Sequence, residues 1–212
     1  MERVIIVDVN HTPVTLDMLK SFDLRVLEAS DLTGRLVAWD GWKEFDPSST
    51  LVVFPGNGAS IIRKYLPVNW FEKWTTVSVP AKRYWEPGSA PVVISQRIFP
   101  SSMMLGWRKI VVVDDVVSSG TTARVLHRIN QPWFPGADWY AVTWVAQMSY
   151  SARCYSGVHA VEWVGTDKTK IPINSLSTLL AEREIAESFA NRNLREDDSV
   201  RFLDLLQELR TV

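Results

Sequence analysis

The stretch KIVVVDDVVSSGTT, residues 109–122, constrains the fold of this chain more than any other segment. Its branched apolar residues, 110–113, predict a strand buried on both faces, and we expect that strand to end at Asp114 and Asp115. After a short polar loop, apolar residues at helical spacing predict a helix over 122–130. The loop therefore lies between the carboxyl end of a strand and the amino end of a helix, where α/β proteins commonly bind ligands.

The composition of this loop suits a phosphate group. It reads Ser118, Ser119, Gly120, Thr121 and Thr122. The N–H groups of a first helical turn have no partner within the helix, and the helix dipole adds partial positive charge there. The hydroxyl groups add donors, and the glycine lets a ligand approach the backbone closely. We expect these five residues to hold a phosphate.

The two carboxylates indicate what else the ligand carries. Asp114 and Asp115 would repel a phosphate, so they should bind another part of the same molecule. Vicinal hydroxyl groups and a bound Mg²⁺ are the simplest choices. A sugar phosphate has both a phosphate and hydroxyl groups, so it accounts for the loop and the acids together.

At these residues the sequence resembles the type I phosphoribosyltransferases. Their motif is an apolar strand, two acids, two apolar residues and a hydroxyl-rich loop with glycine, and it is filled here over 14 of 212 residues. The resemblance implies that Asp114 and Asp115 bind the ribose hydroxyls of phosphoribosyl pyrophosphate (PRPP), and that residues 118–122 bind its 5′-phosphate. It also implies Mg²⁺ as cofactor and transfer of ribose 5-phosphate to a nitrogenous base, with release of pyrophosphate.

A second glycine loop follows a second predicted strand, 51–54. Gly56, Asn57 and Gly58 precede a helical pattern, which again predicts an anion site at a helix start. In the resembled family a loop at this place holds the pyrophosphate, and many members have a basic residue in it. This chain has Asn57 instead.

Two cations follow a third predicted strand, 75–79. In the resembled family a mobile loop after this strand closes over the pyrophosphate, which implies that Lys82 and Arg83 stabilise the leaving group. The alternative is a solvated basic pair on a surface loop. The irregular segment 87–106 suits a lid that opens and closes.

Strands alternating with helices predict an α/β fold with a mostly parallel sheet covered on both faces. The last predicted strand, 158–164, contains Trp163 near its end, and Asp167 and Lys168 follow shortly after it. In several family branches this segment stacks on the acceptor base and contacts it, so these residues are candidates for base binding. A core tryptophan and surface charges are the alternative.

Length and composition predict a single domain over residues 1–212, with its core at about 50–165. The terminal segments would form a hood over the base and packing helices, and the C-terminal third reads as helical. One helix is expected around 176–189 and a second one capped by Ser199. Apolar stripes on these helices could also form a homodimer face.

A net charge of −1 argues against a nucleic-acid partner and favours small-molecule substrates. The single cysteine, Cys154, favours a reducing compartment, and the short apolar run after Met1 is too short for a signal peptide or a membrane span. We therefore expect a cytoplasmic protein.

Two alternatives stay open. The same fold could serve a non-catalytic regulator that senses PRPP or a nucleotide, because the central motif does not separate binding from turnover. Separately, residues 8–12 resemble the Asp-x-Asp-x-Thr motif of haloacid-dehalogenase-like phosphatases. Asn10, however, stands where the second aspartate would handle a proton. The acceptor could be a purine, a pyrimidine or a nicotinate-like ring.

Overall fold

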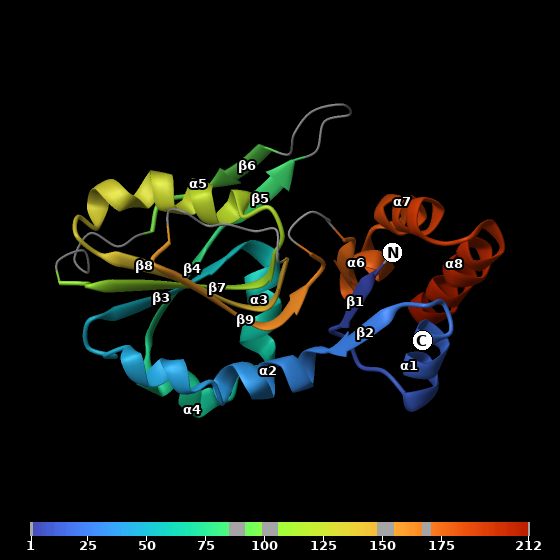
Figure 1. The fold of residues 1–212 in the computed structure, drawn as a ribbon, viewed down its shortest axis with the longest axis horizontal. Helices are drawn as coiled ribbons and strands as arrows, with labels where there is room; N and C mark the ends of the chain where they lie inside the picture. Colours follow the sequence, from blue (N-terminus) through green and yellow to red (C-terminus); the bar gives the residue numbers. More distant parts are fainter. Residues whose placement is uncertain (1, 85–91, 99–105, 148–154, 167–170, 212) are drawn as a thin grey trace. The chain divides into compact units, whose positions relative to one another are not determined.

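The chain divides into two compact units in a computed structural model (Figure 1). The model describes residues 2–84, 92–98, 106–147, 155–166 and 171–211. The larger unit is Leu32–Lys168, and the smaller one joins Met1–Asp31 to Thr169–Val212. Compactness does not establish whether the units fold independently, so the single domain expected from the sequence stays a prediction.

The larger unit is built on a sheet of five parallel strands in the order β4-β3-β7-β8-β9. Their bounds are Thr50–Pro55 for β3, Thr75–Val79 for β4, Lys109–Val117 for β7, Asp138–Gln147 for β8 and Gly157–Val164 for β9. The predicted mostly parallel α/β sheet is confirmed. β7 is the central strand, and its residues 110–113 are at most 2% exposed, as the apolar run predicted.

Helices cover both faces of this sheet (Figure 1). On one face lies α5, Thr121–Asn130, whose Ala123 and Leu126 pack against Ile110 and Val112. On the other lie α3, Gly56–Tyr65, and α4, Val68–Lys73. Before the sheet begins, the chain forms α2, Ala29–Val37, and the 3-10 helix η1, Asp40–Glu44; a second 3-10 helix, η3, Gln131–Trp133, follows α5.

Tryptophans form much of the core on the α4 side. Trp42 packs at 5.4 Å, between ring centroids, from both Trp70 and Trp74, and all three are at most 7% exposed. They line a recess of about 240 Å³. Each such aromatic pair adds roughly 0.5–1.5 kcal/mol beyond the area it buries. These three of the ten tryptophans are therefore core residues.

The segment after β4 differs from the sequence prediction. Residues 81–88 were expected to be a loop, but β5, Ala81–Tyr84, pairs antiparallel with β6, Val92–Ser95. A hydrogen bond from the Gln96 N–H to the Pro80 carbonyl, at 3.1 Å, closes the open end of the pair. The β-branched residues Val92, Val93 and Ile94 favour a strand, which the predicted irregular segment 87–106 overlooked. Its remaining parts, 87–91 and 99–105, lie outside the described residues.

The smaller unit brings the two ends of the chain together. Its three parallel strands, in the order β10-β1-β2, are β1, Val4–Val7, β2, Arg25–Glu28, and β10, Ile173–Ser175. Its helices are α1, Pro13–Lys20, α6, Leu176–Ala181, α7, Arg183–Asn193, and α8, Glu196–Arg210. The helical C-terminal segment is as predicted. A role of these terminal segments as a hood stays a prediction.

Two details of the C-terminal helices were predicted wrongly. The single helix expected around 176–189 is divided at Glu182, which has extended backbone angles, into α6 and α7. Ser199 does not cap α8, because the helix already begins at Glu196. The Ser199 hydroxyl instead donates to the buried Ala190 carbonyl at 2.9 Å and ties α8 to α7.

Asp8, at the end of β1, fastens this unit internally. Its carboxylate is 8% exposed and accepts hydrogen bonds from the Ser177 N–H, at 2.8 Å, and from the Ser177 hydroxyl. The carboxylate thus joins β1 to α6 and satisfies an N–H of the first helical turn.

In the described part of the chain, no helix is both long and apolar enough for a membrane span.

We predict that Asn130→Ala destabilises the larger unit by about 1–3 kcal/mol, the cost of leaving a buried donor unpaired. Asn130 is fully buried, and its side-chain oxygen accepts from the Ile98 N–H at 2.6 Å, while its amide donates to the Leu126 carbonyl at 2.8 Å. Urea unfolding measures the loss. Asn193→Ala, which removes the same kind of local bond to Phe189 without a long-range partner, should cost clearly less. Equal losses would refute the importance of the bond to Ile98.

Candidate ligand site at the carboxyl edge of the sheet

The strand order places a crevice between β3 and β7. From β3 the chain crosses to β4 on one side, and from β7 it crosses to β8 on the other side. Open α/β sheets bind ligands at such a switch point, outside the carboxyl ends of the strands. The two glycine-containing loops of the sequence, 56–58 and 118–122, follow these two strands and so lie at the same edge.

The acid pair lies within β7 and not after it. The strand was expected to end at Asp114, but it continues to Val117. Asp114 pairs in register with Thr143 of β8. Because successive side chains leave a strand on opposite faces, Asp114 is on the α5 side, with Ile110 and Val112, and Asp115 is on the α3 side. The two carboxylates therefore lie on opposite faces of the strand, at the carboxyl edge of the sheet.

The glycine loop touches Asp115. A Cβ atom added to Gly58 would lie 2.1 Å from the Asp115 Oδ1 atom, far inside van der Waals contact. The same Oδ1 atom accepts a hydrogen bond from the Val116 N–H at 2.8 Å. Gly58 is in the first turn of α3, whose N–H groups and dipole favour a negative charge. The absence of a side chain at residue 58 thus lets a carboxylate approach this helix start.

The same loop also contacts β5. Gly56 has a φ of +67°, and a Cβ there would lie 2.6 Å from the Ala81 carbonyl oxygen. Glycine is required for both reasons. This contact brings the start of β5 next to the loop, and Lys82 follows as an exposed residue paired in register with Ile94. The backbone of Arg83 is in β5, but its side chain lies outside the described part of the structure.

The hydroxyl-rich loop leads directly into α5. Gly120 caps the helix in the left-handed conformation, with φ 66° and ψ 16°. The hydroxyls of Ser119 and Thr121 lie 2.9 Å apart and share a hydrogen bond. Ser118 and Thr122 are half-buried. The helix begins at Thr121, so the position of the loop at a helix start is as predicted, and its binding of phosphate stays a prediction.

Two residues of this edge were missed by the sequence prediction. Arg124, in the first turn of α5, donates to the Ser119 carbonyl at 2.7 Å and to the Thr121 hydroxyl at 3.2 Å. Thr143, fully buried on β8, donates to the Asp115 carbonyl at 2.9 Å. The arginine could have been noticed as a cation three residues after Thr121. The threonine carries no sequence signal, since only strand pairing brings it to the acids.

The cation nearest to the glycine loop in sequence is used elsewhere. Arg63 donates to the Ser78 hydroxyl at 2.5 Å, and its guanidinium lies over the rings of Phe54 and Phe71, at 5.5 and 5.2 Å. It therefore reinforces the packing of α3 and α4 beside β4. Asn57 itself is exposed.

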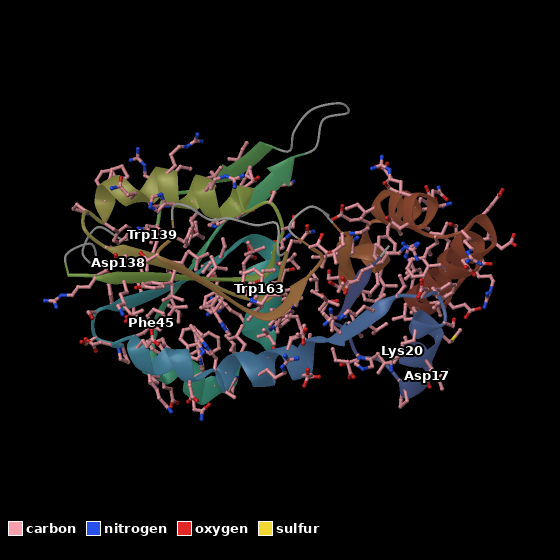
Figure 2. All side chains as sticks on the ribbon, in the orientation of Figure 1. Asp17, Lys20, Phe45, Asp138, Trp139 and Trp163 are labelled. Carbon is pink, nitrogen blue, oxygen red and sulfur yellow. The ribbon has the colours of Figure 1, made fainter. Side chains whose placement is uncertain are left out.

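Trp163 lies near the carboxyl end of β9 and is 38% exposed. Figure 2 shows it at the opposite end of the sheet from Asp138 and Trp139, where β8 begins. β8 separates its strand from β7. Asp167 and Lys168 lie outside the described residues, so the base-binding role of all three stays a prediction.

The histidines of the larger unit are packed against aromatic rings. His159 stacks on Trp39 with 3.9 Å between ring centroids, and burial lowers the pKa of its imidazole. His127 lies edge-on to Trp139, and burial lowers the pKa of its imidazole as well.

Among the described residues, no group of three or more histidine, cysteine or acidic side chains could hold a metal ion. A magnesium ion at Asp114 or Asp115 would therefore need most of its ligands from a bound phosphate and water, which is how Mg²⁺ usually binds.

The chain is similar in fold to several solved phosphoribosyltransferases. The xanthine-guanine-hypoxanthine phosphoribosyltransferase of Helicobacter pylori is 14% identical, with a TM-score of 0.48, over 74% of this chain and 92% of that one. The purine phosphoribosyltransferase of Pyrococcus horikoshii Ot3 is also 14% identical, with a TM-score of 0.44, over 81% and 97%.

A hypothetical protein from Neisseria gonorrhoeae, solved with bound ppGpp, is 13% identical, with a TM-score of 0.44, over 96% of this chain and 97% of that one. At these identities and TM-scores, no residue of this chain takes a role from the three structures. No family model matches the sequence, and no curated protein matches it.

We predict that Gly58→Ala disturbs the candidate site while leaving the fold largely intact. The new methyl group would overlap the Asp115 carboxylate, which must then move. PRPP binding, measured by calorimetry, should weaken by about tenfold or more, the effect of losing one charge-assisted contact. Gly34→Ala, on α2 with open space at its Cβ position, is the matched control and should bind PRPP normally. Normal PRPP binding by Gly58→Ala would contradict the assignment of Gly58 and Asp115 to the ligand site.

Proposed function

We propose that this chain is a Mg²⁺-dependent phosphoribosyltransferase, which moves ribose 5-phosphate from PRPP to a ring nitrogen of a base and releases pyrophosphate. The observation that carries the proposal is the contact between Gly58 and Asp115. It joins, at one switch point, the acidic motif of β7 and the glycine loop of α3, which lie more than fifty residues apart in the sequence. A ligand with a ribose between two phosphate groups fits this arrangement.

Each part of PRPP then has a partner of suitable chemistry. The 5′-phosphate would accept hydrogen bonds from the N–H groups and hydroxyls of residues 118–122. Asp114 and Asp115 would accept hydrogen bonds from the ribose hydroxyls, one from each side of the strand. Thr143, by holding the Asp115 carbonyl, would fix the backbone directly after the two acids. Binding energy from the phosphate, remote from the reacting carbon, would orient the sugar.

The pyrophosphate would leave over the helix start of α3. Negative charge grows on its oxygens as the bond to the sugar breaks, while the sugar ring becomes cationic. The N–H groups of residues 56–58 and the cations Lys82 and Arg83 would stabilise the first charge, and the two carboxylates would favour the second. When bound, Mg²⁺ would neutralise pyrophosphate oxygens, with Asp115, on the α3 side, as the nearer of the two acids.

The acceptor would be a flat heterocycle, with Trp163 and Asp167 as candidates for stacking and base contacts. No nucleic acid or membrane partner is proposed. A cytoplasmic location and a homodimer stay predictions.

A second candidate is a regulator that binds PRPP or a nucleotide without turnover. One observation favours it: the glycine loop has Asn57 where a cation would help the leaving group, and Arg63 is bound to Ser78. Such a protein would keep the acid pair and the hydroxyl-rich loop, since these serve binding. Turnover separates the two candidates.

The deciding experiment is calorimetric titration with PRPP and Mg²⁺, followed by a pyrophosphate-release assay with a panel of purines, pyrimidines and nicotinate-like rings. Binding with release for one ring would support the enzyme and identify its acceptor. Binding without release for any ring would favour the regulator. No binding of PRPP would overturn the enzyme and the PRPP-binding regulator together, and leave only a regulator that binds a nucleotide.

Asp115→Asn should weaken PRPP binding by about tenfold or more, because an amide keeps the shape of the side chain but loses the charge that holds the ribose hydroxyls. The melting temperature should change little, since asparagine has nearly the same size and its side-chain oxygen can still accept the hydrogen bond from the Val116 N–H. Calorimetry and thermal unfolding measure the two effects. A large loss of stability would instead mean that Asp115 is structural.

Lys82→Ala should lower turnover more than PRPP affinity, because the cation is needed most when charge develops on the leaving group. Steady-state kinetics give kcat and KM separately. Lys43→Ala, which removes an exposed lysine paired only with Asp40 among its described contacts, serves as the control for net charge. Unchanged turnover in Lys82→Ala would count against a role for this strand in catalysis.

A further inference from the structure

Arg124 lies outside the acidic and hydroxyl motif, yet it binds the loop of that motif at two points. We propose that Arg124 is a positioning residue, which orients the hydroxyls of Ser119 and Thr121 so that the loop donates hydrogen bonds to the 5′-phosphate. The inference rests on the proposed function of this loop and goes beyond it, because it assigns specificity for an anion to a residue that is not part of the motif.

The two bonds of Arg124 span the left-handed turn at Gly120. One guanidinium nitrogen donates to the Ser119 carbonyl at 2.7 Å, before the turn, and the other donates to the Thr121 hydroxyl at 3.2 Å, after it. A planar guanidinium with a fixed fork of donors holds both ends of such a turn in one geometry. The loop is thereby fixed in shape before a ligand arrives.

The bonds of Arg124, Ser119 and Thr121 leave one hydroxyl proton for a ligand. Arginine donates and never accepts, so the Thr121 oxygen must be an acceptor in its bond with Arg124. Ser119 and Thr121 also share one hydrogen bond at 2.9 Å, which uses one of their two protons. Whichever hydroxyl donates in that bond, the proton of the other remains for a ligand. The pair therefore offers a donor to the outside, which suits a phosphate better than a neutral hydroxyl.

Helix stability does not explain an arginine at this position. Arg124 is exposed and belongs to the first turn of α5, where a positive charge opposes the helix dipole. No acidic residue is present in that turn to offset it. A cation placed against the dipole and beside a hydroxyl-rich loop has a clear use when an anion binds there, because the anion then interacts with both charges.

Arg128 offers a matched control. It is also an exposed arginine of α5, one helical turn further along, so removing it changes the net charge by the same amount. Of the two arginines, Arg124 alone has described hydrogen bonds to residues of the loop. A difference between the two variants would therefore report on the loop.

The test is calorimetry of wild type, Arg124→Ala, Arg124→Lys and Arg128→Ala with ribose 5-phosphate, PRPP and pyrophosphate. Arg124→Ala should weaken ribose 5-phosphate and PRPP by about tenfold or more, the scale of one charge-assisted bond, and leave pyrophosphate binding unchanged. Arg124→Lys, which keeps the charge but not the fork, should recover only a small part of the loss. Arg128→Ala should bind all three ligands as wild type does.

Several results would overturn the inference. Unchanged binding by Arg124→Ala would remove Arg124 from the site, and full recovery by Arg124→Lys would reduce its role to charge alone. An equal loss for pyrophosphate, or for Arg128→Ala, would indicate a general effect of structure or net charge. If wild type itself binds neither ribose 5-phosphate nor PRPP, the proposed function fails first.

If Arg124→Ala folds poorly, Thr121→Val tests the same hydrogen bond by removing its acceptor. It should weaken ribose 5-phosphate binding, and combining it with Arg124→Ala should add less than the sum of the two losses. Fully additive losses would mean that the two residues act independently, which contradicts the proposal.

Discussion

The structure of the larger unit depends on β7, which lies between β3 and β8 in the sheet and is buried on both faces. Residues 109–112 of β7 pair with both neighbouring strands, and the apolar residues of β7 are covered by α3 on one side and α5 on the other. Such a strand cannot bury two carboxylates at small cost, since unpaired buried charges are strongly unfavourable. Asp114 and Asp115 are therefore tolerated only where the strand reaches the edge of the sheet, and this places their charges at the crevice.

Small residues then determine how closely the neighbouring segments approach these charges. Gly58 lets the first turn of α3 meet Asp115, Gly56 lets β5 meet the same loop, and Gly120 turns the chain into α5. Each of these contacts is backbone on one side, so it depends on the absence of a side chain and not on an attractive group. Larger residues at 56 or 58 would separate the segments. The geometry of the candidate site thus depends on the absence of side chains at its glycines as well as on its polar groups.

Most strands of the larger sheet and both glycine-containing segments could be predicted from the sequence, because apolar runs such as 110–113 and the glycines after them are local signals. It did not contain β2 or β10, whose short strands pair with β1 from distant parts of the chain. The antiparallel pairing of β5 with β6 was also missed, although the two strands are near in sequence. For the site, the motif residues were found, whereas Arg124 and Thr143 were not. Arg124 contacts residues of its own segment and could have been noticed, whereas the contact of Thr143 arises from strand register, which no single segment of sequence encodes.

The pairing of β1 with β10 has a consequence for biosynthesis. Residues 4–6 must wait for residues 173–175 before their sheet is complete, since these strands are neighbours despite their distance in the sequence. All five strands of the larger sheet are synthesised before that point. On the ribosome, the larger unit can therefore assemble while the first strand of the chain still lacks one of its neighbours. The smaller unit is therefore completed only after every strand of the larger sheet has been made.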